Sequence, residues 1–214
     1  MGAIGSFIPV PFDEVTISSL RAGPGQDLSP VSPSIGIHTQ QVVNKCTGLV
    51  LQSDPFDNHG EDFCIRDLDG EVRVVCRSSS ASNGRKVITD PQGNTMISIK
   101  SKTSISRSYI GEGKNGEEIF RMKKKFALGS SMEVSFQDTF SSRRRFIQLR
   151  GDFWVGSADI LLVSGPLIAQ FSRRQIQSKG LDPSKETYIV NVAPGVDLAL
   201  ITAICICFEE SKDK

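Results

Sequence analysis

The sequence is poor in the residues that carry most enzyme chemistry, and it has no apolar run long enough for a membrane-spanning helix. Among 214 residues there are two histidines and one tryptophan. Neither His38 nor His59 belongs to an H-x-x-E-H, H-E-x-x-H or G-x-S-x-G frame. The formal net charge is +1, so overall charge gives no argument for nucleic acid and any basic site must be local. We therefore expect a protein that is not an enzyme and holds no cofactor or metal ion.

The cysteines are odd in number and spread along the chain. They are Cys46, Cys64, Cys76, Cys205 and Cys207. On a helix, two cysteines two positions apart point in different directions, which disfavours a metal pair at the last two. We recognise no signal peptide at the start, so we expect reduced thiols and a cytoplasmic monomer, with peripheral association with membranes as an open alternative.

The longest apolar run extends from Val196 to Phe208 and is followed by charged residues. Its thirteen positions are interrupted by Asp197 and Thr202, whereas a helix needs about 20 apolar residues to cross a bilayer. On a helical wheel the run leaves no polar stripe wider than Thr202, and a helix that is apolar all round is buried all round. A strand is the alternative, because several residues are β-branched, but it would be unusually long. The run predicts a buried helix over 196–209.

Between about residues 47 and 193, short runs of Val, Ile and Phe alternate with turn residues. The pattern predicts hairpins at 63–77 and 86–100 and a third hairpin loop at 111–118. We expect Asp67 and Asp90 to form turns, where aspartate accepts backbone hydrogen bonds. Ten or so antiparallel strands followed by one buried helix predict a mainly β fold, a closed barrel with the helix inside it.

The ends of the chain differ in composition from this region. Residues 1–42 are rich in Gly, Pro and Ser and predict a mobile arm. The barrel domain is then expected over 43–210 and a charged tail over 211–214. Gly2 fits the M-G-x-x-x-[ST] frame of N-myristoylation, a frame that often matches by chance, so lipidation at Gly2 and an unmodified terminus both stay open.

Several motifs in order resemble the LURP-one-related family. They are F-x-I-x-D-x-x-G at 63–70, V-x-x-D-x-x-G at 87–93, LRGDF at 149–153, LIAQFSRR at 167–174 and the closing APGVDLALITAICICFEE. The resemblance covers about residues 45 to 210. That family belongs to the tubby C-terminal-like group, to which phospholipid scramblases are also related. The resemblance implies a twelve-stranded antiparallel barrel around a central hydrophobic helix. Some tubby proteins bind phosphoinositide headgroups through basic residues on the barrel surface, and some LURP-one-related proteins are linked to plant defence.

Two stretches carry basic residues at strand spacing. In IFRMKKKFALG, a period of two places Phe120, Met122, Phe126 and Leu128 on one face and Arg121, Lys123 and Lys125 on the other. Lys124 does not fit and is expected to turn towards the apolar side. In SRRRFIQLRG, the same period turns Ile147 and Leu149 inward and leaves Arg144, Gln148 and Arg150 outside. We call Arg121, Lys123, Lys125, Arg144 and Arg150 the basic face.

The basic face has two interpretations. It could be a solvated surface that discourages edge pairing, or it could bind anionic phospholipid headgroups. Nucleic acid is not expected as a partner, because no stacking aromatic residues lie between the charges.

Two other features are candidate functional sites. The acidic loop 54–62 could gather a hard cation through oxygen ligands, but its spacing matches no EF-hand loop, so a solvated loop is expected. Trp154 could anchor an unidentified protein partner if it is exposed, or pack under a loop. The alternative function is therefore a protein-interaction scaffold without a lipid ligand.

Overall fold

A computed structural model describes residues 28–53, 63–78, 84–102, 108–125, 131–152, 157–174 and 187–211, with the backbone alone at 53, 125, 152 and 174. Within these ranges the chain forms twelve strands, one short 3-10 helix and one α-helix. The helices are η1 (Thr39–Gln41) and α2 (Leu198–Glu210). The strands are β1 (Thr47–Ser53), β2 (Phe63–Asp67), β3 (Val72–Ser78), β4 (Lys86–Thr89), β5 (Thr95–Lys102), β6 (Ser108–Glu112), β7 (Glu118–Lys125), β8 (Ser131–Asp138), β9 (Arg143–Asp152), β10 (Ser157–Leu162), β11 (Leu167–Arg174) and β12 (Thr187–Val192).

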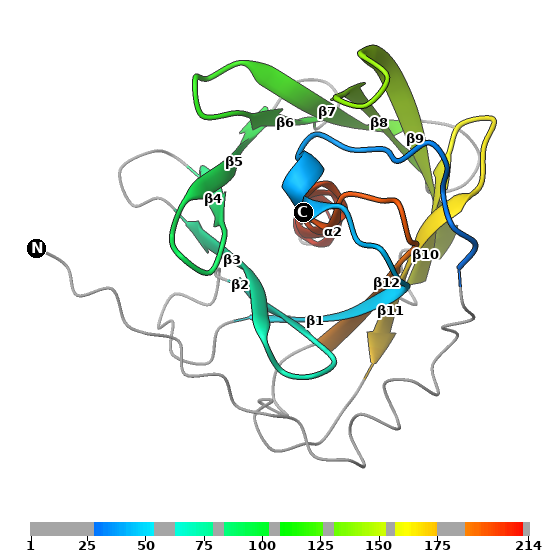
Figure 1. The fold of residues 1–214 in the computed structure, drawn as a ribbon. Helices are drawn as coiled ribbons and strands as arrows, with labels where there is room; N and C mark the ends of the chain where they lie inside the picture. Colours follow the sequence, from blue (N-terminus) through cyan, green and yellow to red (C-terminus); the bar gives the residue numbers. More distant parts are fainter. Residues whose placement is uncertain are drawn as a thin grey trace, which may run out of the picture.

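The strands close into one antiparallel barrel (Figure 1). Each strand pairs with the strand that follows it in the chain, and β1 also pairs with β12. Closure is visible in the register of β1, where Leu49 lies opposite both Val190 of β12 and Asp67 of β2. A closed sheet leaves no edge strand open to pairing with another chain. The predicted closed barrel is confirmed, and the described residues contain the twelve strands that the family resemblance implied.

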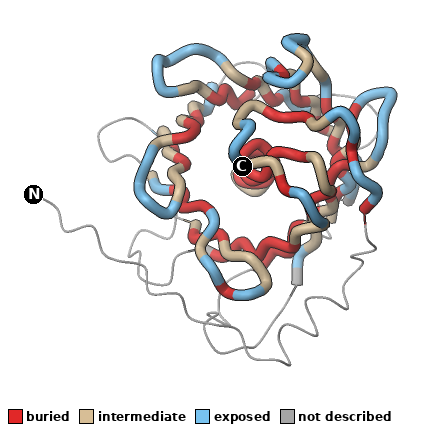
Figure 2. The backbone as a smooth tube through the Cα atoms, in the orientation of Figure 1, coloured by how far each residue is buried: buried red, intermediate tan, exposed pale blue. Residues whose placement is uncertain are grey.

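Alternation along each strand separates the interior of the barrel from its outer wall. In β8, Met132, Val134 and Phe136 are fully buried, whereas the residues between them are half-buried. Figure 2 shows the buried positions along the strands and along the helix that they surround. The apolar side chains of the strands therefore pack around the helix as one core.

Helix α2 lies inside the barrel (Figure 1), and all of its residues from 198 to 208 are buried. Asp197 caps its N-terminus, since its Oδ1 accepts hydrogen bonds from the backbone N–H groups of Ala199 and Leu200. Near the other end, the ring of Phe208 packs edge-on against Phe171 with centroids 5.1 Å apart. The predicted buried helix is confirmed, and it begins at residue 198 and ends at residue 210.

Two polar contacts tie the C-terminal end of α2 to the barrel wall. Nζ of Lys86, a buried residue of β4, lies 3.1 Å from Oε1 of Glu210. The hydroxyl of Tyr188 in β12 donates a hydrogen bond of 2.6 Å to Glu209. Since a buried cation needs a partner, the Lys86–Glu210 pair fixes where the helix leaves the core.

The first described residues correct the predicted extent of the N-terminal arm. Leu28, Val31 and Ile35 are buried in the core, so the segment 28–46, which we call the N-terminal segment, packs on the barrel and is not an arm. Figure 1 shows this segment crossing the barrel opening in front of α2. The prediction was based on the high Pro and Ser content of this stretch, but a few apolar residues between them pack into the core.

Backbone contacts hold the N-terminal segment in place. Ile35 forms a bridge with Val196 and Val42 forms one with Asp197, next to the start of α2. The buried carboxylate of Asp138 accepts a hydrogen bond of 3.0 Å from the N–H of Gly36. The β8–β9 turn and the start of the helix therefore fasten this segment from two sides.

The turn aspartates behave as predicted. Oδ1 of Asp67 accepts hydrogen bonds of 3.0 Å from the N–H groups of Asp69 and Glu71. Oδ1 of Asp90 accepts one of 2.8 Å from the N–H of Asn94. The β2–β3 and β4–β5 hairpins are thus stabilised locally by their own acidic residues.

Candidate functional site

The basic face lies on two strands, β7 and β9, which flank β8 on one wall of the barrel (Figure 1). Lys125 of β7 and Arg150 of β9 both lie opposite Ser131 of β8. Lys123 lies opposite Glu133 of β8. With one strand between them, the backbones of the two basic segments run about 10 Å apart. The structure therefore places both predicted segments on the same wall without making them direct neighbours.

The side chains of β9 follow the predicted alternation. Ile147 and Leu149 are fully buried in the core. Arg144 and Arg150 are exposed on the outer wall. The guanidinium of Arg150 donates two hydrogen bonds, of 3.0 and 2.8 Å, to Oε1 of Gln148 on the same strand. This strand presents both of its predicted basic residues to solvent.

The side chains of β7 alternate in the same way over most of the strand. Phe120 and Met122 are fully buried, whereas Arg121 is half-buried and Lys123 is exposed. The outward residues of β7 and β9 therefore share one surface, with Ser131, Glu133 and Ser135 of β8 between them.

Lys124 corrects the expectation that it turns towards the apolar side. It lies opposite the buried Met132 of β8, yet its own side chain is exposed. Because β7 ends at the next residue, the long side chain of Lys124 reaches solvent past the end of the packed core. The side chain of Lys125, a predicted member of the basic face, lies outside the described residues.

Glu118 reports the electrostatic character of this wall. Its carboxylate accepts a hydrogen bond of 3.0 Å from Nε of Arg121. This hydrogen bond, together with the positive charges of Arg144 and Lys102, holds the pKa of Glu118 below its ordinary value. Arg121 and Glu118 thus form an ion pair at the start of β7, which neutralises part of the positive charge of this wall.

Lys102 is a basic residue that the sequence interpretation missed. It lies at the end of β5, is exposed, and is opposite Ser108 of β6, which is in turn opposite Lys123 of β7. The alternation in TMISIKSK already places Lys102 on the outer side, but only the strand order shows that β5 and β7 lie two strands apart. Lys102 therefore extends the basic wall beyond β7.

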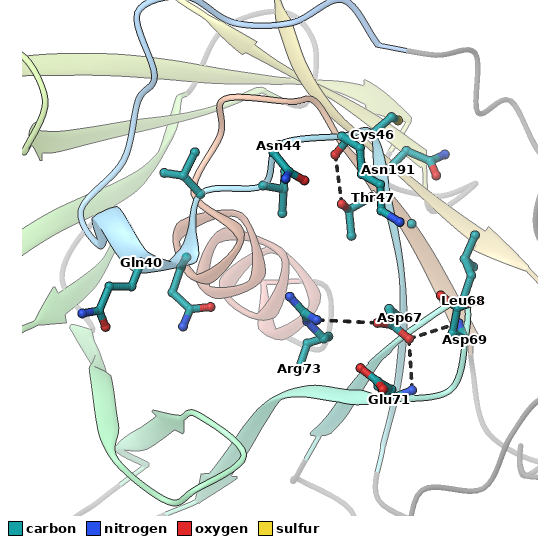
Figure 3. Close-up of a pocket in the computed structure, with 15 residues that line it drawn as sticks. Gln40, Asn44, Cys46, Thr47, Asp67, Leu68, Asp69, Glu71, Arg73 and Asn191 are labelled. Carbon is teal, nitrogen blue, oxygen red and sulfur yellow. Dashed lines mark hydrogen bonds and ion pairs between the residues drawn. The ribbon is translucent and has the colours of Figure 1, made fainter.

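A hollow of about 800 Å³ lies elsewhere, between the N-terminal segment and the β2–β3 turn. In Figure 3, Gln40 and Asn44 line one side, and Asp67 and Arg73 line the other. Oδ2 of Asp67 lies 3.8 Å from Nη1 of Arg73. Oδ1 of Asp67 also accepts the hydrogen bonds of its own turn. The hollow is thus lined by charges of both signs and by neutral amides, and the carboxylate of Asp67 already binds backbone groups of its own turn.

The structure does not place every residue singled out in the sequence. Gly2, the loop 54–62 and Trp154 lie outside the described residues. All five cysteines are described, and the structure links none of them by a disulfide. In the part of the chain that the structure describes, no group of three or more His, Cys, Asp and Glu residues is placed to hold a metal ion.

None of the described helices is long and apolar enough to cross a membrane.

Comparison with known proteins agrees with this architecture. No curated protein shows significant similarity to the chain. The family model described as LURP-one-related matches residues 47–209, from the start of β1 to the last turn of α2, and the closed barrel around a helix is consistent with the tubby C-terminal-like group. The chain therefore belongs to the LURP-one-related family.

Proposed function

We propose that this LURP-one-related barrel binds anionic phospholipid headgroups, phosphoinositides in particular, through the basic face and Lys102. In this proposal the protein changes nothing in the lipid chemically and acts in signalling or defence as a cytoplasmic protein that associates peripherally with membranes. The observation that supports it is the grouping of cations from three strands on one outer wall, namely Arg144 on β9, Arg121 and Lys123 on β7, and Lys102 on β5. Three strands supply these cations to one outer wall, so an anion with several negative charges can contact more than one of them at once.

The strength of such binding follows from the number of cations. Each basic residue near an anionic bilayer contributes about 1 kcal/mol, so a handful of them supports reversible recruitment and no permanent attachment. Glu118 and Glu133 lie on the same wall and reduce the net positive charge. The expected interaction is therefore weak, reversible and sensitive to salt.

The direct test is to reverse the charges of β7. The triple variant Arg121→Glu, Lys123→Glu and Lys125→Glu should lose co-sedimentation with phosphatidylcholine vesicles that contain phosphoinositide. Because Arg121 and Lys123 lie on the outer wall, the melting temperature should change little. Equal sedimentation of the variant and the wild type would show that the face is only a solvated surface.

A matched control reverses three exposed basic residues elsewhere on the barrel. Lys45 lies in the N-terminal segment, Arg77 in β3 and Arg173 in β11, and all three are exposed. Replacing all three by Glu changes the net charge as much as the first variant does. This control should keep most of the vesicle binding, because the proposal assigns binding to the wall and not to overall charge. If both variants lose binding alike, the wall has no special role. If the wild type does not bind the vesicles, the protein-interaction scaffold replaces the proposal.

A further inference from the structure

Large apolar side chains are exposed at few places on this barrel. Among the described residues they are Phe140, Phe146 and Val163, with 41%, 43% and 47% of their surface exposed. Phe140 lies in the β8–β9 turn. Phe146 lies in β9, and Val163 directly follows β10. An exposed phenyl ring on a strand costs free energy in water and is informative when it adjoins a second exposed apolar residue.

Phe146 and Val163 are such neighbours. The N–H of Val163 donates a hydrogen bond of 2.8 Å to the carbonyl of Phe146, which continues the β9–β10 pairing by one residue. The residues next to them in sequence, Ile147 and Leu162, are buried and lie opposite each other. Since successive side chains alternate, Phe146 and Val163 both project from the outer wall.

This apolar pair adjoins the basic face. Phe146 lies two residues from Arg144 along β9, on the same side of the strand. It also lies opposite Ser135 of β8, and Ser135 lies opposite Arg121 of β7. The short side chain of Ser135 therefore separates the phenyl ring of Phe146 from the guanidinium of Arg121 across one strand.

We infer that Phe146 and Val163 enter the headgroup region of an anionic bilayer when the basic face docks on it, so that the ligand is the bilayer surface and not a soluble headgroup. This inference rests on the proposed function. Cations next to exposed apolar side chains match the two layers of such a surface, phosphates outside and acyl chains directly below. A soluble inositol phosphate offers only the first layer, and its binding leaves the phenyl ring in water.

The test replaces the apolar pair while leaving every charge in place. The double variant Phe146→Ser and Val163→Ser should bind phosphatidylcholine vesicles that contain phosphoinositide roughly tenfold more weakly than the wild type, since burial of apolar surface is lost. The matched control, Phe146→Leu with Val163→Leu, keeps apolar side chains at the same positions and should bind within about threefold of the wild type. The melting temperatures of both variants should fall only slightly below that of the wild type, because close to half of the surface of each residue is already exposed.

Soluble inositol trisphosphate, titrated by calorimetry, separates the bilayer from its headgroup. It should bind far more weakly than the vesicles do, and equally to the wild type and the serine variant. The inference is overturned if the serine variant binds vesicles as the wild type does, or if inositol trisphosphate binds as tightly as the vesicles.

The two proposals fail in different ways. If the serine variant loses vesicle binding while the charge-reversed β7 variant keeps it, the apolar contact stands and the basic face does not. If the charge-reversed variant loses binding and the serine variant keeps it, the basic face stands and the apolar contact falls. If wild-type protein does not bind the vesicles, both proposals fall.

Discussion

Asp197 connects two parts of the molecule through one buried carboxylate. Oδ1 accepts hydrogen bonds of 2.8 and 3.2 Å from the N–H groups of Ala199 and Leu200 in α2. Oδ2 accepts bonds of 2.8 and 2.7 Å from those of Ile37 and His38 in the N-terminal segment. Both oxygens are therefore needed as acceptors, and the start of the helix and the segment that crosses the barrel opening depend on the same side chain.

Asp197→Asn should destabilise the fold although it preserves size and shape. An amide has only one acceptor oxygen, so its NH2 group would face two backbone N–H donors, and each donor that loses its acceptor at this site costs up to about 1–3 kcal/mol. Urea unfolding followed by circular dichroism measures this loss. Asp90→Asn is the matched control, because both oxygens of Asp90 also accept hydrogen bonds, but in an exposed turn where water can replace a lost partner. Equal stability of the two variants would contradict the role given to Asp197.

Single residues were predicted well where their partners are local. Asp67 and Asp90 bond backbone groups within four residues, so the turn sequence alone indicates their role. Asp138 and Asp197 bond Gly36 and Ile37 across 102 and 160 residues. No local pattern contains those partners, and in the sequence Asp197 stood out only as an interruption of the apolar run 196–208.

At the scale of elements, helix α2 is the core around which the strands pack. Its apolar residues contact the inward residues of the strands in one cluster, and its ends are fixed by Asp197 at one end and by the Lys86–Glu210 pair at the other. The all-round apolar surface was readable from the sequence, since a helix without a polar stripe has no side that can face water. The cap was not, because the predicted helix 196–209 contained Asp197, which instead caps a helix that begins at Leu198.

Ile204→Asp should prevent folding, because it places an unpaired charge inside the barrel. Deleting residues 196–214 should give insoluble protein, because the barrel would lose the helix that fills its interior. Ile204→Val removes only one methylene and should cost about 0.5–1.5 kcal/mol. Solubility and far-ultraviolet circular dichroism are the readouts. A soluble truncated chain with the wild-type spectrum would rule out α2 as the centre of the fold.

The sequence predicted which side chains of a strand point inward only where that part of the strand packs against the core. In the middle of β7 and β9 the alternation matches the burial of Met122 and Ile147. At the end of β7 the alternation fails for Lys124, which is exposed at an inward position. The order of the strands is a long-range property, so the sequence could not show that β8 separates the two basic segments or that Lys102 adds to them.

For the whole molecule, closure of the sheet determines where function can reside. The interior is filled by α2 and the side chains around it. A ligand of any size must therefore bind on the outer wall or at an opening of the barrel. The opening at the start of α2 is crossed by the N-terminal segment and contains the hollow of Figure 3, which has charges of both signs. The outer wall formed by β5 to β9 carries the grouped cations, so we propose that binding occurs on this wall.

Salt dependence of vesicle binding by the wild-type protein tests this central claim most directly. Co-sedimentation is measured with phosphatidylcholine vesicles, with and without phosphoinositide, from low salt to several hundred millimolar. Exposed charges are screened beyond about 8 Å at physiological ionic strength, so we predict binding to the phosphoinositide vesicles at low salt that mostly disappears at the highest salt, and little binding to phosphatidylcholine alone at any salt. Failure to sediment with phosphoinositide vesicles at low salt, or binding that salt does not weaken, would contradict the account.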